Sequence, residues 1–177
     1  MKSVLISIQP KWCELIASGK KTVEVRKTRP KIETPFKCYI YMTKDKWYKD
    51  YKNKNHYGSG KVIGEFVCDR IGYVRNYGDM VDSYDCIASC LSANEIIEYA
   101  KDKNGNFVYT YGWHISGLVI YDKPKELREF SRACNGDCQH CEYAIWETRG
   151  YNDPIIVDCK TIRPPQSWRY VEGVEGE

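Results

Sequence analysis

The apolar positions of the chain fall into short runs, and their spacing predicts both strands and helices. Ser3–Ile8 is rich in β-branched residues, which favour a strand. Directly after it, Trp12, Leu15 and Ile16 recur at helical spacing and predict a helix with one apolar face. Gly19 is the expected end of this helix. The first predicted elements are therefore a strand and a helix.

Later segments continue this mixture. Phe36–Met42 and Lys61–Arg70 are predicted strands with few turn-forming residues. Ser92 and Glu95 form a capping-box pattern, which predicts a helix over 93–101. Further strands are expected at Thr22–Lys27, Phe107–Tyr111 and Trp113–Tyr121, the last two paired and the second ended by Pro124.

The C-terminal stretch Ile162–Val171 has a pattern of its own. Pro164 and Pro165 exclude a central strand, because proline cannot donate to the hydrogen-bond ladder. We expect Trp168 and Tyr170 to pack back on the domain.

The stretch Gly19–Arg26 holds the densest group of candidate functional side chains. If it is a strand, its two valines point into a core, and Thr22, Glu24 and Arg26 point the other way. Lys21 lies at the strand entrance. A carboxylate and a guanidinium on one face support each other and present polar groups to a ligand. The alternative is a surface ion pair worth about 0–1 kcal/mol.

Charge is distributed unevenly along the 177 residues. Residues 1–61 hold 15 Lys/Arg and 5 Asp/Glu, whereas residues 62–177 hold 12 and 19. A basic half suggests a surface for a polyanion. The alternative is that the two halves mix in three dimensions.

One segment of the basic half also carries aromatic residues. Lys44–Gly60 interleaves lysines with Trp47, Tyr48, Tyr51 and Tyr57. Basic groups can neutralise phosphates and aromatic rings can stack on unpaired bases. The alternative is a solvated, tyrosine-rich insertion.

Cysteines gather in the last third of the sequence. Cys134, Cys138 and Cys141 are spaced C-x3-C-x2-C, and Cys159 follows downstream. Four thiolates can hold a structural zinc ion in a closed tetrahedral site, and His140 is able to replace one of them. The alternative is a set of cysteines without metal. The total of nine cysteines favours free thiols or metal ligands over disulfides.

Four further side chains are candidates for a ligand site. Glu65 can face the same pocket as Glu24 or lie on the barrel surface. Tyr111 and Trp113 can stack on a base, although core packing is the commoner fate of such residues. His114 can act as an acid or base, or close the core as a half-buried histidine.

The pattern Gly19-x-Lys21-x-x-Glu24-x-Arg26 resembles the signature of the ASCH domain family, which belongs to the PUA-like superfamily. The surroundings agree, since a strand and a Gln-Pro-Lys helix precede the motif and Tyr111-Gly112-Trp113-His114 follows later. The resemblance covers about residues 2–130. With its Pro-Pro-Gln-Ser-Trp tail, the chain also looks like ASCH-containing proteins of phages and prophages.

The resemblance implies an α+β fold with a small mixed β-barrel and flanking helices, and a role in binding RNA or modified nucleotides. Some bacterial relatives hydrolyse N4-acetylcytidine with a lysine and a threonine nucleophile, and at least one is described as a ribonuclease. Lys21 matches that lysine, but Glu24 occupies the threonine position. A carboxylate does not replace a hydroxyl nucleophile, so this activity is not inherited.

Together these observations predict an ASCH barrel over 1–130 and a Cys-rich extension over 131–177 packed on it. The expected function is binding of RNA or a nucleotide-like ligand in a basic cleft beside Lys21–Arg26. The alternatives are a hydrolase in which Lys21 and Glu24 are catalytic, or a phage-encoded interaction protein with a zinc knuckle. No apolar run approaches the roughly 18–20 residues of a membrane span, and no signal peptide is recognisable, which predicts a soluble cytoplasmic protein.

Overall fold

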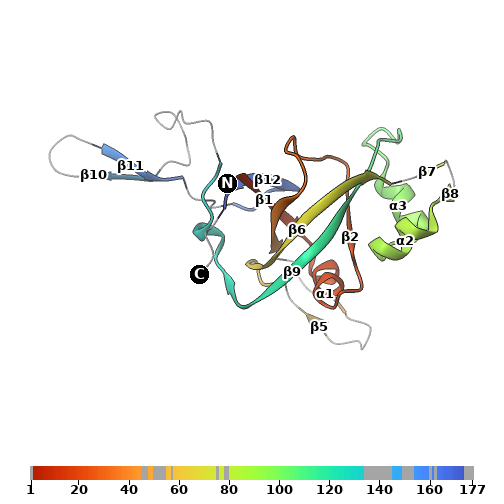
Figure 1. The fold of residues 1–177 in the computed structure, drawn as a ribbon, viewed down its shortest axis with the longest axis horizontal. Coiled ribbons are helices and arrows are strands. Elements are labelled where there is room, and N and C mark those ends of the chain that lie inside the picture. The colour runs from red at the N-terminus through yellow and green to blue at the C-terminus, as the bar shows by residue number, and fades with distance from the viewer. Residues whose placement is uncertain are drawn as a thin grey trace.

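A mixed six-stranded sheet forms the centre of the molecule (Figure 1). The computed structural model describes residues 2–44, 48–49, 55–56, 58–74, 76–77, 80–133, 145–148, 154–159, 161 and 163–173. The strands, in sheet order, are β12 (Trp168–Glu172), β1 (Lys2–Ile8), β3 (Phe36–Met42), β6 (Val62–Tyr73), β9 (Tyr111–Lys125) and β2 (Val23–Arg26). β1 and β3 are parallel, and the other neighbouring pairs are antiparallel.

The α+β class is confirmed, but the predicted closed barrel is wrong. In the described part of the chain, β12 and β2 are the two edges of an open sheet. The end of β1, next to the edge strand β12, still approaches β2, because the Nη2 atom of Arg26 on β2 donates to the carbonyl of Ser7 on β1 at 2.6 Å. β2 has only four residues, and its charged residues Glu24 and Arg26 are buried.

Helices lie beside the sheet. α1 (Pro10–Ala17) follows β1, α2 (Ser83–Ser89) and α3 (Ala93–Tyr99) lie between β6 and β9 in the chain, and the 3-10 helix η1 (Leu127–Glu129) follows β9. The predicted capping box of α3 is present. Val25 of β2 packs with Val74 and with Ile96 of α3, so the helices cover one face of β2. Within the described residues, no helix has the length and apolar character needed to cross a membrane.

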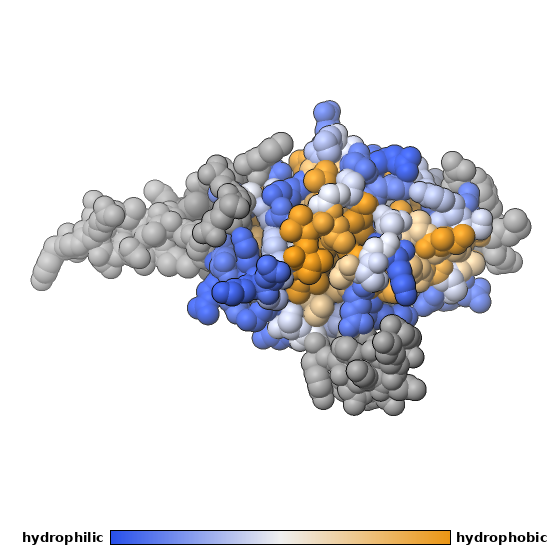
Figure 2. Space-filling model, turned by 60° about the horizontal axis from the view of Figure 1, so that its bottom comes forward, coloured by the Kyte–Doolittle hydropathy of each residue, from blue (hydrophilic) through white to orange (hydrophobic). Residues whose placement is uncertain are grey.

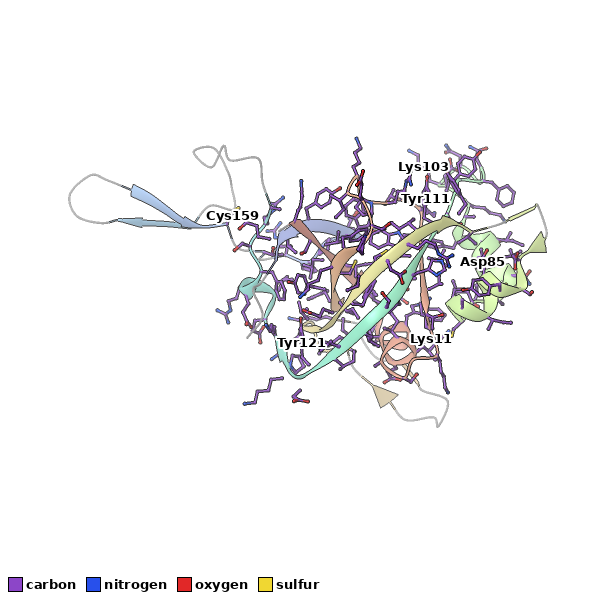
Figure 3. All side chains as sticks on the ribbon, viewed as in Figure 1. Lys11, Asp85, Lys103, Tyr111, Tyr121 and Cys159 are labelled. Carbon is purple, nitrogen blue, oxygen red and sulfur yellow. The ribbon has the colours of Figure 1, made fainter. Side chains whose placement is uncertain are left out.

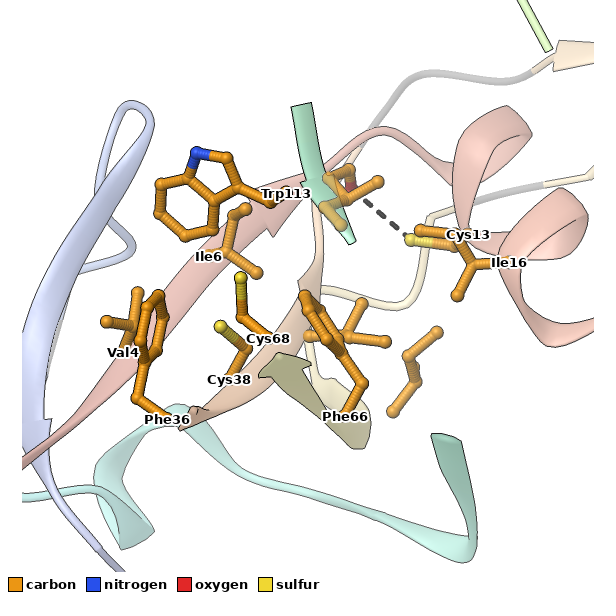
Figure 4. Close-up of a cluster of buried hydrophobic side chains, with 12 residues drawn as sticks. Val4, Ile6, Cys13, Ile16, Phe36, Cys38, Phe66, Cys68 and Trp113 are labelled. Atoms are coloured by element: carbon orange, nitrogen blue, oxygen red, sulfur yellow. Dashed lines mark hydrogen bonds between the residues drawn. The ribbon is translucent and has the colours of Figure 1, made fainter. Parts of the chain in front are cut away.

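Two apolar clusters lie on opposite faces of the sheet. The larger one holds Ile6, Cys13, Phe36, Cys38, Phe66, Cys68 and Trp113, all shown in Figure 4. The second packs Leu5 and Tyr39 against Phe130 and Val171 from the C-terminal part of the chain. Burial raises the pKa of the Cys68 thiol to about 12, so this cysteine acts as an apolar core residue.

The strand after residue 107 differs from the prediction. Instead of two paired strands, Tyr111–Lys125 forms one long strand, β9, which pairs with β6 along most of its length. Register shifts in this pairing let both strands curve. One shift lies at Gly64, where an added Cβ would come within 2.4 Å of the Val119 carbonyl oxygen.

Val119 and Ile120 are exposed, and Figure 2 shows apolar side chains at the centre of one face with hydrophilic ones around them.

Three short antiparallel pairs lie outside the large sheet. They are β4 (Tyr48–Lys49) with β5 (Asn55–His56), β7 (Asn76–Tyr77) with β8 (Met80–Val81), and β10 (Ile145–Thr148) with β11 (Pro154–Asp158). β10 and β11 extend away from the sheet (Figure 1). As expected, the prolines of the C-terminal stretch precede an edge strand, β12, and Trp168 of that strand packs on Trp113 with ring centroids 5.9 Å apart.

Candidate functional site

A pocket of about 1210 Å³ opens where the sheet fails to close. β1 and β2 contribute Ser7, Glu24 and Arg26 to its walls, and α1 contributes Trp12. Further lining residues come from both ends of α1, from β2, from the segments around β3 and before β6, from the α2–α3 region and from the C-terminal part of the chain. They are Gln9, Lys21, Val25, Tyr41, Thr43, Lys44, Gly60, Leu91, Glu95, Glu98, Tyr99, Glu126, Leu127, Arg128, Thr161, Pro164, Pro165 and Gln166.

Three charged side chains meet at this pocket. The Nη2 atom of Arg26 lies 3.0 Å from Oε1 of Glu24, and Nζ of Lys21 lies 3.3 Å from Oε2 of the same carboxylate. Lys21 also donates to the carbonyl of Ser89 at 2.6 Å. All three residues are buried, with exposures of 2% for Lys21, 6% for Glu24 and 9% for Arg26. Two cations therefore share one carboxylate, so this group of three side chains carries one excess positive charge, and Glu95 and Glu98 also line the pocket.

Several polar atoms at the pocket have no hydrogen-bond partner among the described residues. These atoms are Oε2 of Glu24, Nε of Arg26 and Oγ1 of Thr161. The Lys21 ammonium is close to Glu24 Oε2 but is not hydrogen-bonded to it. A buried polar atom without a partner costs about 1–3 kcal/mol, so such atoms are expected where a ligand or water completes the bonding.

Local backbone structure holds Lys21 in this place. Gly19 ends α1 with a φ of 73°, and the backbone N–H groups of Lys20 and Lys21 then both donate to the Leu15 carbonyl. The side chain of Lys21 passes near Trp12, with its ammonium 5.2 Å from the ring centroid. The turn after α1 therefore directs this lysine into the pocket.

The structure brings together only part of the predicted ligand site. Lys21, Glu24 and Arg26 line one pocket, as expected from their spacing. Thr22 was predicted to share their face, but it is exposed and lies outside the pocket lining. The charged side chains and Val25 are all buried, because the core covers one side of β2 and the helices cover the other.

Glu65 belongs to a different cluster. Its carboxylate lies 2.7 Å from Lys37 Nζ and accepts a hydrogen bond from the Tyr121 hydroxyl at 2.5 Å. Burial acts to raise the pKa of Glu65, but the bonds from Lys37 and Tyr121 outweigh it and hold the pKa below its usual range. Its partner Tyr121 lies at the opposite end of β9 from Tyr111 (Figure 3). Glu65 is not part of the pocket lining.

The three predicted candidates at the start of β9 also lie outside the pocket lining. Trp113 is fully buried in the larger core cluster, which favours the packing alternative. Tyr111 stacks against Tyr73, with ring centroids 5.2 Å apart. His114 Nδ1 lies 3.2 Å from a guanidinium nitrogen of Arg70, and burial together with that cation lowers the His114 pKa.

Two sequence predictions fall wholly or partly outside the described residues. Cys159 is buried, but Cys134, Cys138, Cys141 and His140 are not described, so the zinc site stays a prediction. The described residues contain no group of three or more metal-ligating side chains. The side chains over 45–57 of the basic aromatic segment are likewise not described, although its flanking Lys44 and Gly60 line the pocket.

Comparison with known proteins places the chain in a family. The model of the ASCH domain matches residues 6–125, and the chain therefore belongs to the ASCH domain family. The crystal structure of ASCH from Zymomonas mobilis is 18% identical, covers 96% of this chain and 87% of its own, and superposes with a TM-score of 0.57. A serine-to-alanine mutant of that protein is 20% identical over 96% of this chain and 88% of its own, also with a TM-score of 0.57. At this identity the similarity shows the fold alone, and no curated protein matches the sequence.

Proposed function

We propose that this ASCH domain binds RNA or a nucleotide-like ligand in the pocket between β1 and β2. The observation that carries the proposal is the buried group of Lys21, Glu24 and Arg26, which has excess positive charge and unused hydrogen-bonding atoms at the pocket wall. Such a group is costly to fold without a partner, because several kcal/mol are lost when charges leave water. An anionic ligand offsets this cost.

Each member of the group has a role in this proposal. Lys21 and Arg26 hold a phosphate or the acceptor edge of a base, since charge-assisted bonds to such groups are short and strong. Glu24 accepts a hydrogen bond from a base amine through its unpartnered Oε2. Trp12 lies at the pocket wall and offers a ring for stacking. A nucleotide carries all three complementary features.

Replacement of Lys21 by methionine is expected to weaken RNA binding about ten- to hundredfold, because one charge-assisted contact contributes about 1.5–3 kcal/mol. Methionine has a similar length and leaves the Glu24–Arg26 ion pair in place. The measurement is fluorescence titration of a labelled single-stranded RNA at fixed salt. Thermal melting of the same samples shows that the variant is folded.

Lys20→Met is the matched control, since it removes the same charge from the neighbouring exposed residue, which does not line the pocket. We expect the RNA affinity of this variant to differ from that of the wild type by at most twofold. Equal losses of RNA affinity for Lys20→Met and Lys21→Met would mean that RNA binding depends on overall charge and not on the pocket.

One observation favours a second candidate, a hydrolase acting on RNA. Glu24 lines the pocket between two cations, and its Oε2 has no hydrogen-bond partner among the described residues, which suits a general base on a phosphodiester. Hydrolysis of N4-acetylcytidine is disfavoured, because Glu24 replaces the threonine nucleophile of the relatives that perform it. Incubation with RNA and with N4-acetylcytidine, followed by product analysis, separates the two activities from simple binding.

A further inference from the structure

Part of the pocket wall comes from beyond the ASCH domain match, which ends at residue 125. Leu127, Arg128, Thr161, Pro164, Pro165 and Gln166 all line the pocket. This C-terminal wall is attached to β1 at Ser7. The Ser7 hydroxyl donates to the Pro165 carbonyl at 2.6 Å, and its backbone N–H donates to the Ser167 carbonyl at 2.9 Å.

Ser7 joins the C-terminal wall to the charged group. Its own carbonyl accepts the 2.6 Å bond from Arg26, so one residue contacts both sides of the pocket. The wall is therefore held in a defined position relative to Arg26.

A second group of cations lies near Glu126, which directly precedes the C-terminal wall. Lys61 Nζ lies 2.8 Å from Glu126 Oε1, and Lys44 and Arg128 line the pocket beside that carboxylate. All three cations act on Glu126, since Lys61 first, and then Arg128 and Lys44, lower its pKa. Glu126 is thus paired with Lys61, and Lys44 and Arg128 line the same pocket as this carboxylate.

The side chain of Lys44 packs against Gly60. The aliphatic part of Lys44 crosses Gly60 so closely that a Cβ on this glycine would lie 2.4 Å from Lys44 Cγ. The absence of a side chain at Gly60 leaves room for the lysine stem. The stem of Lys44 therefore lies directly against the Gly60 backbone.

We infer that Lys44 and Arg128 form a second anion subsite, so that the pocket takes an RNA segment with at least two phosphates. This inference rests on the proposed function and adds to it the class of ligand. The buried group around Glu24 holds one nucleotide, and the cations around Glu126 hold a phosphate further along the strand. A free nucleoside monophosphate carries only one phosphate group and fills one subsite.

The test compares two ligands and three variants of the full chain. The ligands are a pool of random-sequence tetraribonucleotides and a mixture of the four ribonucleoside 5′-monophosphates. Arg128→Gln and Lys44→Gln each remove one subsite cation, and both residues are exposed. Lys123→Gln is the matched control, because Lys123 is exposed and does not line the pocket.

We expect the wild type to bind the tetranucleotides more tightly than the monophosphates. Each subsite variant should reduce the dependence of log K on log salt concentration by about 0.7, the value for one lost phosphate contact on a single strand. Their loss of affinity should be smaller for the monophosphates than for the tetranucleotides, because only the longer ligand reaches both subsites. Lys123→Gln should leave the salt dependence unchanged.

Two results overturn the inference, and they are distinguishable. If the wild type binds tetranucleotides but Arg128→Gln and Lys44→Gln behave like Lys123→Gln, the second subsite is wrong and the proposed function stands. If the wild type binds neither ligand, the proposed function fails and the subsite fails with it.

Discussion

Replacement of Glu24 by alanine is expected to destabilise the folded protein by about 3–5 kcal/mol, the usual cost of removing one partner from a buried ion pair. Lys21 and Arg26 would then face each other across the pocket without the carboxylate that lies within 3.3 Å of both. Two uncompensated positive charges at 2% and 9% exposure are unfavourable in a medium that screens them poorly.

The measurement is urea unfolding followed by tryptophan fluorescence at constant pH and salt. Glu98→Ala is the matched control, since Glu98 forms an exposed i,i+3 ion pair with Lys101. Such surface pairs contribute about 0–1 kcal/mol. Equal stability losses for the two variants would contradict a buried, electrostatically coupled group around Glu24.

Replacement of Trp113 by alanine is expected to lower the free energy of unfolding by about 3–5 kcal/mol. Trp113 is fully buried and packs edge-on to Phe36 at 5.9 Å between ring centroids. Its deletion leaves a cavity in the larger core cluster, which the surrounding sheet cannot fill by collapsing.

The same variant distinguishes a core residue from a ligand-stacking residue. Trp113→Phe should recover a large part of the lost stability, because it keeps most of the apolar volume and removes an indole N–H that lacks a partner among the described residues. Tyr109→Ala is the control, since this tyrosine is 77% exposed and surface substitutions usually change stability by less than about 0.5 kcal/mol. A stable Trp113→Ala variant with impaired RNA binding would contradict the packing role.

Local sequence signals predicted several elements of the fold. Phe36–Met42 forms a strand with the predicted bounds, and Ser92 and Glu95 cap α3 as expected. α2 was missed, because its seven residues carry no extended apolar period. The open sheet and the unbroken β9 were also missed, since strand closure and the path of a hairpin depend on contacts between distant residues.

The candidate site was likewise predicted only in part from the sequence. Glu24 and Arg26 are two residues apart, so the strand period was enough to put them on one face, whereas the turn after α1 brings Lys21 to them. Trp113 lies opposite Glu24 in the β2–β9 register, yet its ring enters the core while the carboxylate faces the pocket. The sequence carries no local sign of this difference.

The C-terminal wall had no local signal of its role. Pro164 and Pro165 excluded a central strand, but they did not predict the attachment to Ser7. That contact joins residues 158 positions apart in the chain. A pattern within one segment does not report such pairings, and only the folded arrangement shows that Arg128 and Lys44 line the same pocket as Arg26.

The most direct test of the ligand pocket is the NMR signal of the Arg26 Nε–H group during titration with single-stranded RNA. This donor is buried and has no hydrogen-bond partner among the described residues. If the pocket holds the ligand, the signal shifts and saturates at the same RNA concentration as the fluorescence titration. RNA binding that leaves the Arg26 signal unchanged would contradict the proposed site.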